Sequence, residues 1–252
     1  MGFGLMVIGD EILSGKHQDQ HFAKVREMLA ERGLRLDWVS YLGDERWRIT
    51  EALSHSFSGS DVVFCTGGIG STPDDHTRQA AAAALGVPLV LHPEAARLIG
   101  ERTREVGLEV TPERLRMGEF PEGAELIPNP YNRIPGFGIH RHHFVPGFPV
   151  MAWPMIEWVL DTRYAHLFHT QAQTEKAMRV LGLAEATLTP LMERVEADHP
   201  GVRVFSLPHA RRSTTDPWEI ELGVKGPPDR VDAAFRQLRA GVAALGERIE
   251  EI

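Results

Sequence analysis

A glycine-rich run from Thr66 to Asp75 contains the residue types best suited to binding a phosphorylated ligand, and it reads Thr-Gly-Gly-Ile-Gly-Ser-Thr-Pro-Asp-Asp. The run follows an apolar stretch at 61–65, typical of a buried parallel strand, and precedes an alanine-rich helix former at 76–85. Glycines let a backbone bend and a ligand approach, and N–H groups at a helix start can bind phosphate oxygens. The run is therefore predicted to be a phosphate-binding turn. The alternative is a tight turn in which Asp74 or Asp75 caps the helix.

Further acidic residues follow two other apolar runs that are typical of strands. Asp10 and Glu11 come after the first of these runs, and Asp44 comes after the second. In an open α/β sheet, ligands bind outside the carboxyl ends of the strands, so this placement favours a shared site. Carboxylates beside a phosphate repel it, which predicts an intervening divalent cation with oxygen ligands. The alternatives are a solvated turn for Asp10 and a helix N-cap for Asp44.

Apolar periodicity and turn residues predict alternating strands and helices in the first two thirds of the chain. Three successive strand–helix pairs imply an α/β fold with a parallel sheet and right-handed crossovers. The predicted strands are 3–8, 34–42, 61–65, 89–91, 125–127 and 138–145, and the predicted helices are 19–32, 45–57, 76–85, 93–106 and 151–161.

A polar stretch around 165–173 predicts a boundary between a domain at 1–165 and a second domain at 166–252. The second part shows a β-α-β-β-α order, which predicts a small α+β layer and also resembles a KH-type RNA module. It lacks a Gly-x-x-Gly clamp between helices and a surplus of basic residues, so RNA binding is not expected. Arg211-Arg212 is predicted to be a hairpin tip or an arm that reaches another subunit. The predicted elements are 176–181, 185–198, 202–207, 218–224 and 229–245.

Composition excludes several functional classes. The formal net charge of -8 and a pI near 5.8 argue against a nucleic-acid partner. The single cysteine, Cys65, excludes an internal disulfide framework, and it is predicted to be a small buried core residue. No apolar run approaches the roughly 20 residues that span a bilayer, and the N-terminus does not resemble a signal peptide. We therefore expect a cytoplasmic protein with no membrane partner.

Three histidines, at positions 140, 142 and 143, suggest a second possible metal site. Alternation along a strand would place His140 and His142 on one face. A metal site needs three or four convergent ligands, so an exposed hairpin is the preferred interpretation.

Several motifs together resemble the N-terminal domain of the competence/damage-inducible protein CinA, a member of the molybdopterin-binding superfamily that includes MogA and MoaB. The glycine-rich run at 66–75 is similar to Thr-Gly-Gly-Leu-Gly-Pro-Thr-Pro-Asp-Asp of that family. The stretch Gly9-Asp10-Glu11-Ile12-Leu13-Ser14-Gly15 is similar to its Gly-(Thr/Asp)-Glu-Leu-Leu-x-Gly. Gly43-Asp44 and Pro146-Gly147 match its later loops. The resemblance covers nearly the whole chain, and it includes the small second domain.

The resemblance implies a three-layer, parallel-sheet domain of the MogA type that binds molybdopterin or a related phosphorylated small molecule. It also implies a homo-oligomer, because relatives in the superfamily associate. By position, Gly67, Gly68, Gly70, Ser71 and Thr72 would bind the ligand together with Asp10 and Ser14, Asp44 and Asp75 would be catalytic, and Asp44, Asp74 and Asp75 would hold Mg²⁺ or another divalent metal.

Three departures from the family pattern leave the function open. The family's asparagine before the first long helix is replaced by His21, Arg133 stands where small residues are usual, and Met151 replaces an acid. The first hypothesis is binding of a molybdopterin-like or nucleotide phosphate ligand at an acidic, magnesium-binding rim. The second is metal-dependent hydrolysis of an ADP-ribose-like pyrophosphate. The third is a degenerate interaction protein whose pocket Arg133 fills or recharges.

Overall fold

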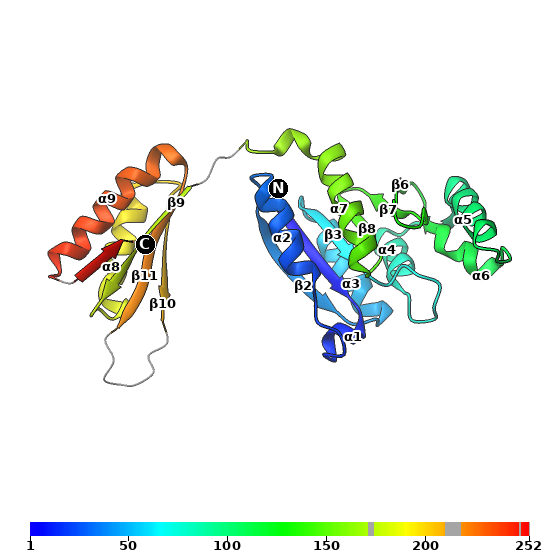
Figure 1. Cartoon of the computed structure of the whole chain (residues 1–252), viewed down its shortest axis with the longest axis horizontal. Helices are drawn as coiled ribbons and strands as arrows, with labels where there is room; N and C mark the ends of the chain where they lie inside the picture. The colour runs from blue at the N-terminus through cyan, green and yellow to red at the C-terminus, as the bar shows by residue number, and fades with distance from the viewer. Residues whose placement is uncertain (171–173, 210–217, 247, 252) are drawn as a thin grey trace. The chain divides into compact units, whose positions relative to one another are not determined.

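The computed structural model describes residues 1–170, 174–209, 218–246 and 248–251 (Figure 1). The chain forms two compact units, Met1–Phe168 and His169–Ile252. Arg211-Arg212 lies outside the described residues. Within those residues, no helix has both the length and the apolar character needed to cross a membrane.

A six-stranded sheet organises the first unit, with the strand order β2-β1-β3-β8-β7-β6. The strands β2, β1, β3 and β8 run parallel, while β7 pairs antiparallel with β8 and β6 pairs antiparallel with β7. The prediction of an α/β fold with a largely parallel sheet is confirmed. The strands are β1 (Phe3–Ile8), β2 (Leu36–Leu42), β3 (Val62–Thr66), β6 (Glu125–Ile127), β7 (Gly136–Ile139) and β8 (His142–Val145).

Helices cover both faces of this sheet and make three layers. Alternation along β1 sends Leu5 and Val7 into one core and Met6 and Ile8 into the other. Helices α2 and α7 contribute to the first core, and α3 and α4 contribute to the second. The described helices of the sheet domain are α1 (Asp10–Leu13), α2 (His21–Glu31), α3 (Arg46–Phe57), α4 (Thr77–Leu85), α5 (Pro93–Glu105), α6 (Pro112–Leu115) and α7 (Pro149–Arg163), and β4 (Leu89–Leu91) pairs with β5 (Glu119–Pro121).

The prediction of one strand over 138–145 is wrong, because the segment contains the turn of the β7–β8 hairpin. His140 adopts φ +52° at this turn, and β8 then pairs with β3 in the interior of the sheet. His142 and His143 are consequently buried, at 2% and 0% exposure. The expectation of an exposed hairpin is thus confirmed for the hairpin and for His140, which is exposed, but it is wrong for His142 and His143. Their apolar neighbours Phe144 and Val145 give the strand a continuous buried run, as in other covered sheets.

The second unit is a four-stranded antiparallel sheet with the order β10-β11-β9-β12 and two helices. The sequence predicted five of its elements and missed β12, a short and highly charged strand. The resulting β-α-β-β-α-β order is that of ferredoxin-like folds. Its elements are β9 (Thr174–Leu181), α8 (Glu185–Asp198), β10 (Arg203–Pro208), β11 (Glu219–Gly226), α9 (Pro228–Ala244) and β12 (Arg248–Glu251).

Candidate functional site

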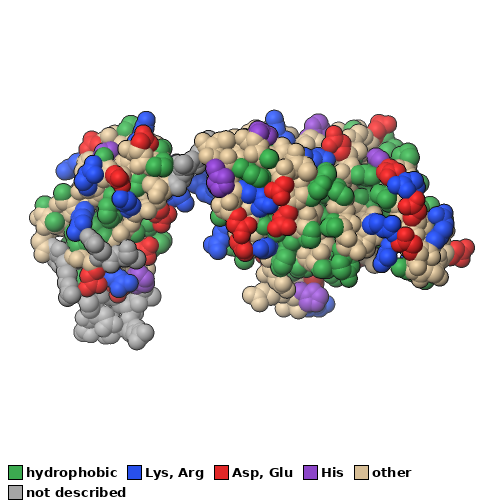
Figure 2. Space-filling view, turned by 45° about the horizontal axis from the view of Figure 1, so that its top comes forward, with side chains coloured by type: hydrophobic (Ala, Val, Ile, Leu, Met, Phe, Trp, Pro, Cys, Tyr) green, Lys and Arg blue, Asp and Glu red, His purple; other side chains and the backbone are tan. Residues whose placement is uncertain are grey.

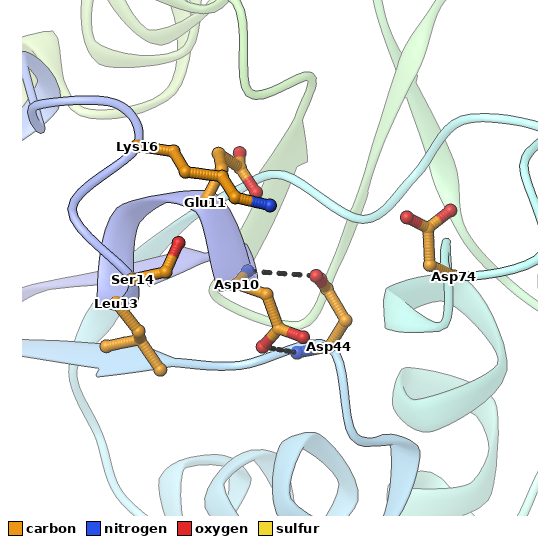
Figure 3. A pocket seen from close by; sticks show the side chains of 7 residues that line it. All are labelled: Asp10, Glu11, Leu13, Ser14, Lys16, Asp44 and Asp74. Carbon is orange, nitrogen blue, oxygen red and sulfur yellow. Dashed lines mark hydrogen bonds between the residues drawn. The ribbon is translucent and has the colours of Figure 1, made fainter.

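The carboxyl ends of β1 and β2 bring Asp10 and Asp44 together. The two strands are parallel neighbours, and Ile8 pairs with Leu42 at the end of the ladder. The backbone N–H of Asp10 donates to Asp44 Oδ2 at 2.9 Å, and the N–H of Asp44 donates to Asp10 Oδ1 at 3.2 Å (Figure 3). Each carboxylate thus holds the loop that carries the other, which fixes both side chains at the sheet edge.

A cavity of about 630 Å³ opens at this edge, and Figure 3 shows Asp74 across from the Asp10–Asp44 pair. Sequence patterns indicated five of its lining residues, among them Glu11, and did not indicate Leu13 and Lys16. Leu13 lies within the motif at 9–15 and Lys16 directly follows it, so their proximity to the site could have been inferred. The lining residues are Asp10, Glu11, Leu13, Ser14, Lys16, Asp44 and Asp74.

Two carboxyl groups of the cavity have pKa values that are shifted in opposite directions. Partial burial raises the pKa of the Asp44 carboxyl, and the nearby charges of Asp10, Glu11 and Asp74 raise it further. Hydrogen bonding from Thr72 and from its own backbone lowers the pKa of the Asp74 carboxyl. The surroundings of Asp44 thus disfavour its charged form, although the N–H of Asp10 partly compensates the charge, and a cation in the cavity would stabilise it.

The glycine-rich turn is held tightly against the end of β1 and the start of α4. Gly67 has φ +99°, and a Cβ there would lie 2.1 Å from the carbonyl oxygen of Ile8. Gly68 has φ +68°, and a Cβ there would lie 2.1 Å from Thr77 Oγ1. The Thr77 hydroxyl donates to the carbonyl oxygen of Gly67 at 3.0 Å. Only glycine fits these two positions.

The turn offers hydrogen-bond donors that the protein does not use. The N–H groups of the four residues at 68–71 donate to no acceptor within the described part of the chain. The Asp75 carboxylate instead accepts the N–H of Thr72 at 2.8 Å and also its hydroxyl, so it braces the turn from inside. Consecutive unpaired amides of this kind can bind anions.

The structure brings together only part of the predicted site. Asp10, Ser14, Asp44 and Asp74 line the cavity. The other predicted residues lie outside its lining, although they share the turn with Asp74; they are Gly67, Gly68, Gly70, Ser71, Thr72 and Asp75. No group of three histidine, cysteine or acidic side chains in the described ranges is close enough to form a metal site on its own.

Arg78 anchors the turn from beneath. Its side chain is 2% exposed and donates from Nη2 to the carbonyl oxygen of Gly70 at 2.6 Å. The other terminal nitrogen donates to the carbonyl oxygens of Arg116 and Glu119. Burial lowers the pKa of its guanidinium, but three carbonyl acceptors compensate the charge.

Replacing Arg78 by methionine should lower the free energy of unfolding by about 2 kcal/mol, because several buried carbonyl groups lose a charged donor. Arg97→Met is the matched control, since Arg97 forms only exposed ion pairs with Glu94 and Glu101. That change should leave the free energy of unfolding nearly unchanged, because exposed ion pairs contribute little to stability. Urea unfolding of both variants measures the difference, and equal losses would show that Arg78 does not anchor the turn.

The three departures from the family pattern do not obstruct the cavity. Arg133 forms an ion pair with Glu105 at the end of α5, in a region where Figure 2 shows basic and acidic side chains interleaved. Met151 Sδ lies 3.3 Å from Asn132 Nδ2, and His21 Nε2 lies 2.9 Å from the carbonyl oxygen of Gly147. The expectation that Arg133 fills or recharges the pocket is wrong for this cavity.

Fold and site together define a class: a three-layer α/β domain with a glycine-rich turn and an acidic cavity at the carboxyl edge of its sheet. Residues 4–166 match the model of a family described as probable molybdopterin binding domain. The chain belongs to this family, and several of its relatives are CinA-like proteins.

Several relatives are similar in sequence to most of this chain, and one solved structure shares the fold of its first unit. A CinA-like protein from Anaeromyxobacter sp. is 32% identical over 98% of this chain and 62% of its own length. A protein from Pyrobaculum arsenaticum is 32% identical over 82% of this chain and 80% of its own length. The crystal structure of the protein CinA from Thermoplasma acidophilum, titled as of unknown function, shares the fold with TM-score 0.58 and 24% identity, covering 64% of this chain and 98% of its own. The chain spans about three fifths of the CinA-like relative.

Proposed function

We propose that the chain binds a phosphorylated small molecule, of the molybdopterin or nucleotide type, in the cavity at the edge of the first sheet. The observation that carries this proposal is the gathering of Asp10, Ser14, Asp44 and Asp74 around a cavity of about 630 Å³. That volume suits a ligand of nucleotide size. The unpaired amides at 68–71 lie in the same turn as Asp74, and they would bind phosphate oxygens.

The acidic lining favours a cation that accompanies such a ligand. Mg²⁺ typically binds through one or two carboxylates and completes its coordination with phosphate oxygens and water. The described residues fit this mode, because they offer separate carboxylates rather than a preformed metal cage. We assign Asp44 and Asp74 to the cation and Asp75 to the support of the turn. When bound, Mg²⁺ would neutralise phosphate charge.

Calorimetry with ADP-ribose and with inorganic pyrophosphate, each with and without Mg²⁺, tests the proposal. Asp44→Asn retains an oxygen that can accept the N–H of Asp10 but removes the charge. This variant should raise the Kd measured with Mg²⁺ at least about tenfold, which corresponds to the loss of one charge-assisted contact. Asp161→Asn is the control. Asp161 lies in α7, forms an ion pair with Arg32 at the end of α2 and does not line the cavity. No affinity for either probe in any condition would refute the proposal.

Hydrolysis of an ADP-ribose-like pyrophosphate is the second candidate. The observation that favours it is the placement of several carboxylates beside one cavity, where a cation could both neutralise phosphate and position water. Incubation with ADP-ribose and Mg²⁺ should then release AMP, and Asp44→Asn should abolish the release. Binding without AMP would restrict the function to ligand binding.

A degenerate interaction protein is the least supported candidate. That hypothesis was based on Arg133 as a residue that fills or recharges the pocket, but Arg133 pairs with Glu105 and does not line the cavity. We also propose that the two compact units act as separate domains, the first for the ligand and the second as an accessory domain.

A further inference from the structure

Lys16 is the one positively charged side chain among the seven residues that line the cavity. Four carboxylates surround the same space, from Asp10, Glu11, Asp44 and Asp74. An anionic ligand that enters this space meets a surplus of negative charge. A positively charged side chain on the lining therefore strengthens the binding of an anionic ligand.

Lys16 differs from the other lysines of the chain in having no ion-pair partner among the described residues. The sequence contains four lysines. Lys24 pairs with Glu27 at 3.0 Å, Lys176 with Asp232 at 2.5 Å, and Lys225 with Glu175 at 3.8 Å. No described carboxylate lies within 4.0 Å of Lys16 Nζ, even though this residue stands in the most acidic surroundings. Its ammonium donors thus stay available to a ligand.

The position of Lys16 suits a contact with phosphate. It lies in the segment between α1 and α2, two residues after Ser14, and its exposed side chain reaches the cavity from the β1 side (Figure 3). Asp74 reaches the same cavity from the glycine-rich turn. Lysine binds phosphate as a mobile point charge, and it needs no rigid bidentate geometry to do so. A phosphate in the cavity could therefore contact the ammonium on one side and the turn on the other.

We propose that Lys16 is a specificity-determining residue that contacts a phosphate group of the ligand and lowers the dependence of binding on a divalent cation. This inference rests on the proposed function, since it concerns the same cavity. It adds that the part of the ligand beside Lys16 is a phosphate or pyrophosphate group whose oxygens are not already bound by a cation. It also predicts that the protein retains measurable affinity for such a ligand when Mg²⁺ is removed.

Calorimetry with inorganic pyrophosphate, first in a chelator and then with saturating Mg²⁺, tests the inference. Lys16→Met should raise the Kd about tenfold in the chelator, as expected for loss of one charge-assisted hydrogen bond at an exposed position. The increase should be smaller with Mg²⁺, because the cation then supplies most of the compensating charge. Lys16→Arg keeps the charge and should stay within about twofold of the wild type.

Lys24→Met is the matched control, because Lys24 is already paired with Glu27 and does not line the cavity. Its Kd should equal that of the wild type in both conditions. Equal affinity of Lys16→Met and wild type in the chelator would overturn the inference, as would wild-type binding that requires Mg²⁺ absolutely. If the wild type binds and responds to Asp44→Asn but not to Lys16→Met, only the inference fails. If the wild type binds pyrophosphate in neither condition, the inference falls too, and ADP-ribose then decides the proposed function.

Discussion

Gly67→Ala is expected to lower the free energy of unfolding of the first unit by about 3 kcal/mol or more. The residue has φ +99°, where an L side chain costs about 1–2 kcal/mol. The added Cβ would also lie 2.1 Å from the carbonyl oxygen of Ile8, which belongs to the backbone of the interior strand β1 and cannot move aside. Overpacking of this kind costs a further 1–3 kcal/mol or so.

Gly86→Ala separates the two contributions. Gly86 has φ +68° at the end of α4, but a Cβ there meets nothing within 4 Å. This variant should lose only about 1 kcal/mol, from the backbone conformation alone. Urea unfolding followed by tryptophan fluorescence measures both, because four of the five tryptophans, at 38, 47, 153 and 158, lie in the first unit. Similar losses for the two variants would contradict the close approach of the turn to β1.

Stability should fall steeply below pH 6.5, because β8 buries two neutral histidines. Burial lowers the pKa of His142 to about 4 and that of His143 to about 3. The unfolded chain binds a proton on each near pH 6.5, so between that pH and the folded pKa values the unfolded state binds more protons. Stability is therefore full above pH 6.5 and decreases as pH falls. The expected loss between pH 6.5 and pH 5 is about 2 kcal/mol for each histidine.

Urea midpoints measured from pH 7.5 to pH 5 check this expectation. In the double variant His143→Leu with Tyr164→Phe, both members of the His143 Nε2–Tyr164 hydroxyl hydrogen bond are replaced by apolar groups. Its pH dependence should be about half that of the wild type. His55→Gln, at an exposed position on α3, should leave the dependence unchanged. A midpoint that stays constant down to pH 5 would show that the two histidines are not held neutral.

Local patterns were sufficient to predict most of the first unit. The apolar run of β1, the amphipathic α2 and the alanine-rich α4 each have one dominant period, and the order of strands and helices implied the parallel sheet. The β7–β8 hairpin was not predictable in this way. Its turn consists of His140 and Arg141, which are not typical turn residues, and the burial of His142 depends on Ser56 and Phe57 of a distant helix.

The candidate site was predictable in outline because strand ends meet at one sheet edge. That rule places Asp10 and Asp44 together, as observed in the structure. It could not determine which way Asp75 points, since the choice between cavity and turn depends on the Thr72 contacts. Neither could it place Arg133 beside Glu105, because the two residues are far apart in sequence and meet only through the packing of α5.

The exchange of backbone hydrogen bonds between Asp10 and Asp44 also has an evolutionary consequence. Loss of either carboxylate leaves an amide of the opposite loop without its acceptor and loosens that loop. The hydrogen bond that remains then joins less fixed partners, so the second carboxylate contributes less once the first is lost. The effects of the two single replacements should therefore not add, and the double replacement should be milder than their sum. Descendants of this chain are thus expected to change positions 10 and 44 together more often than one at a time.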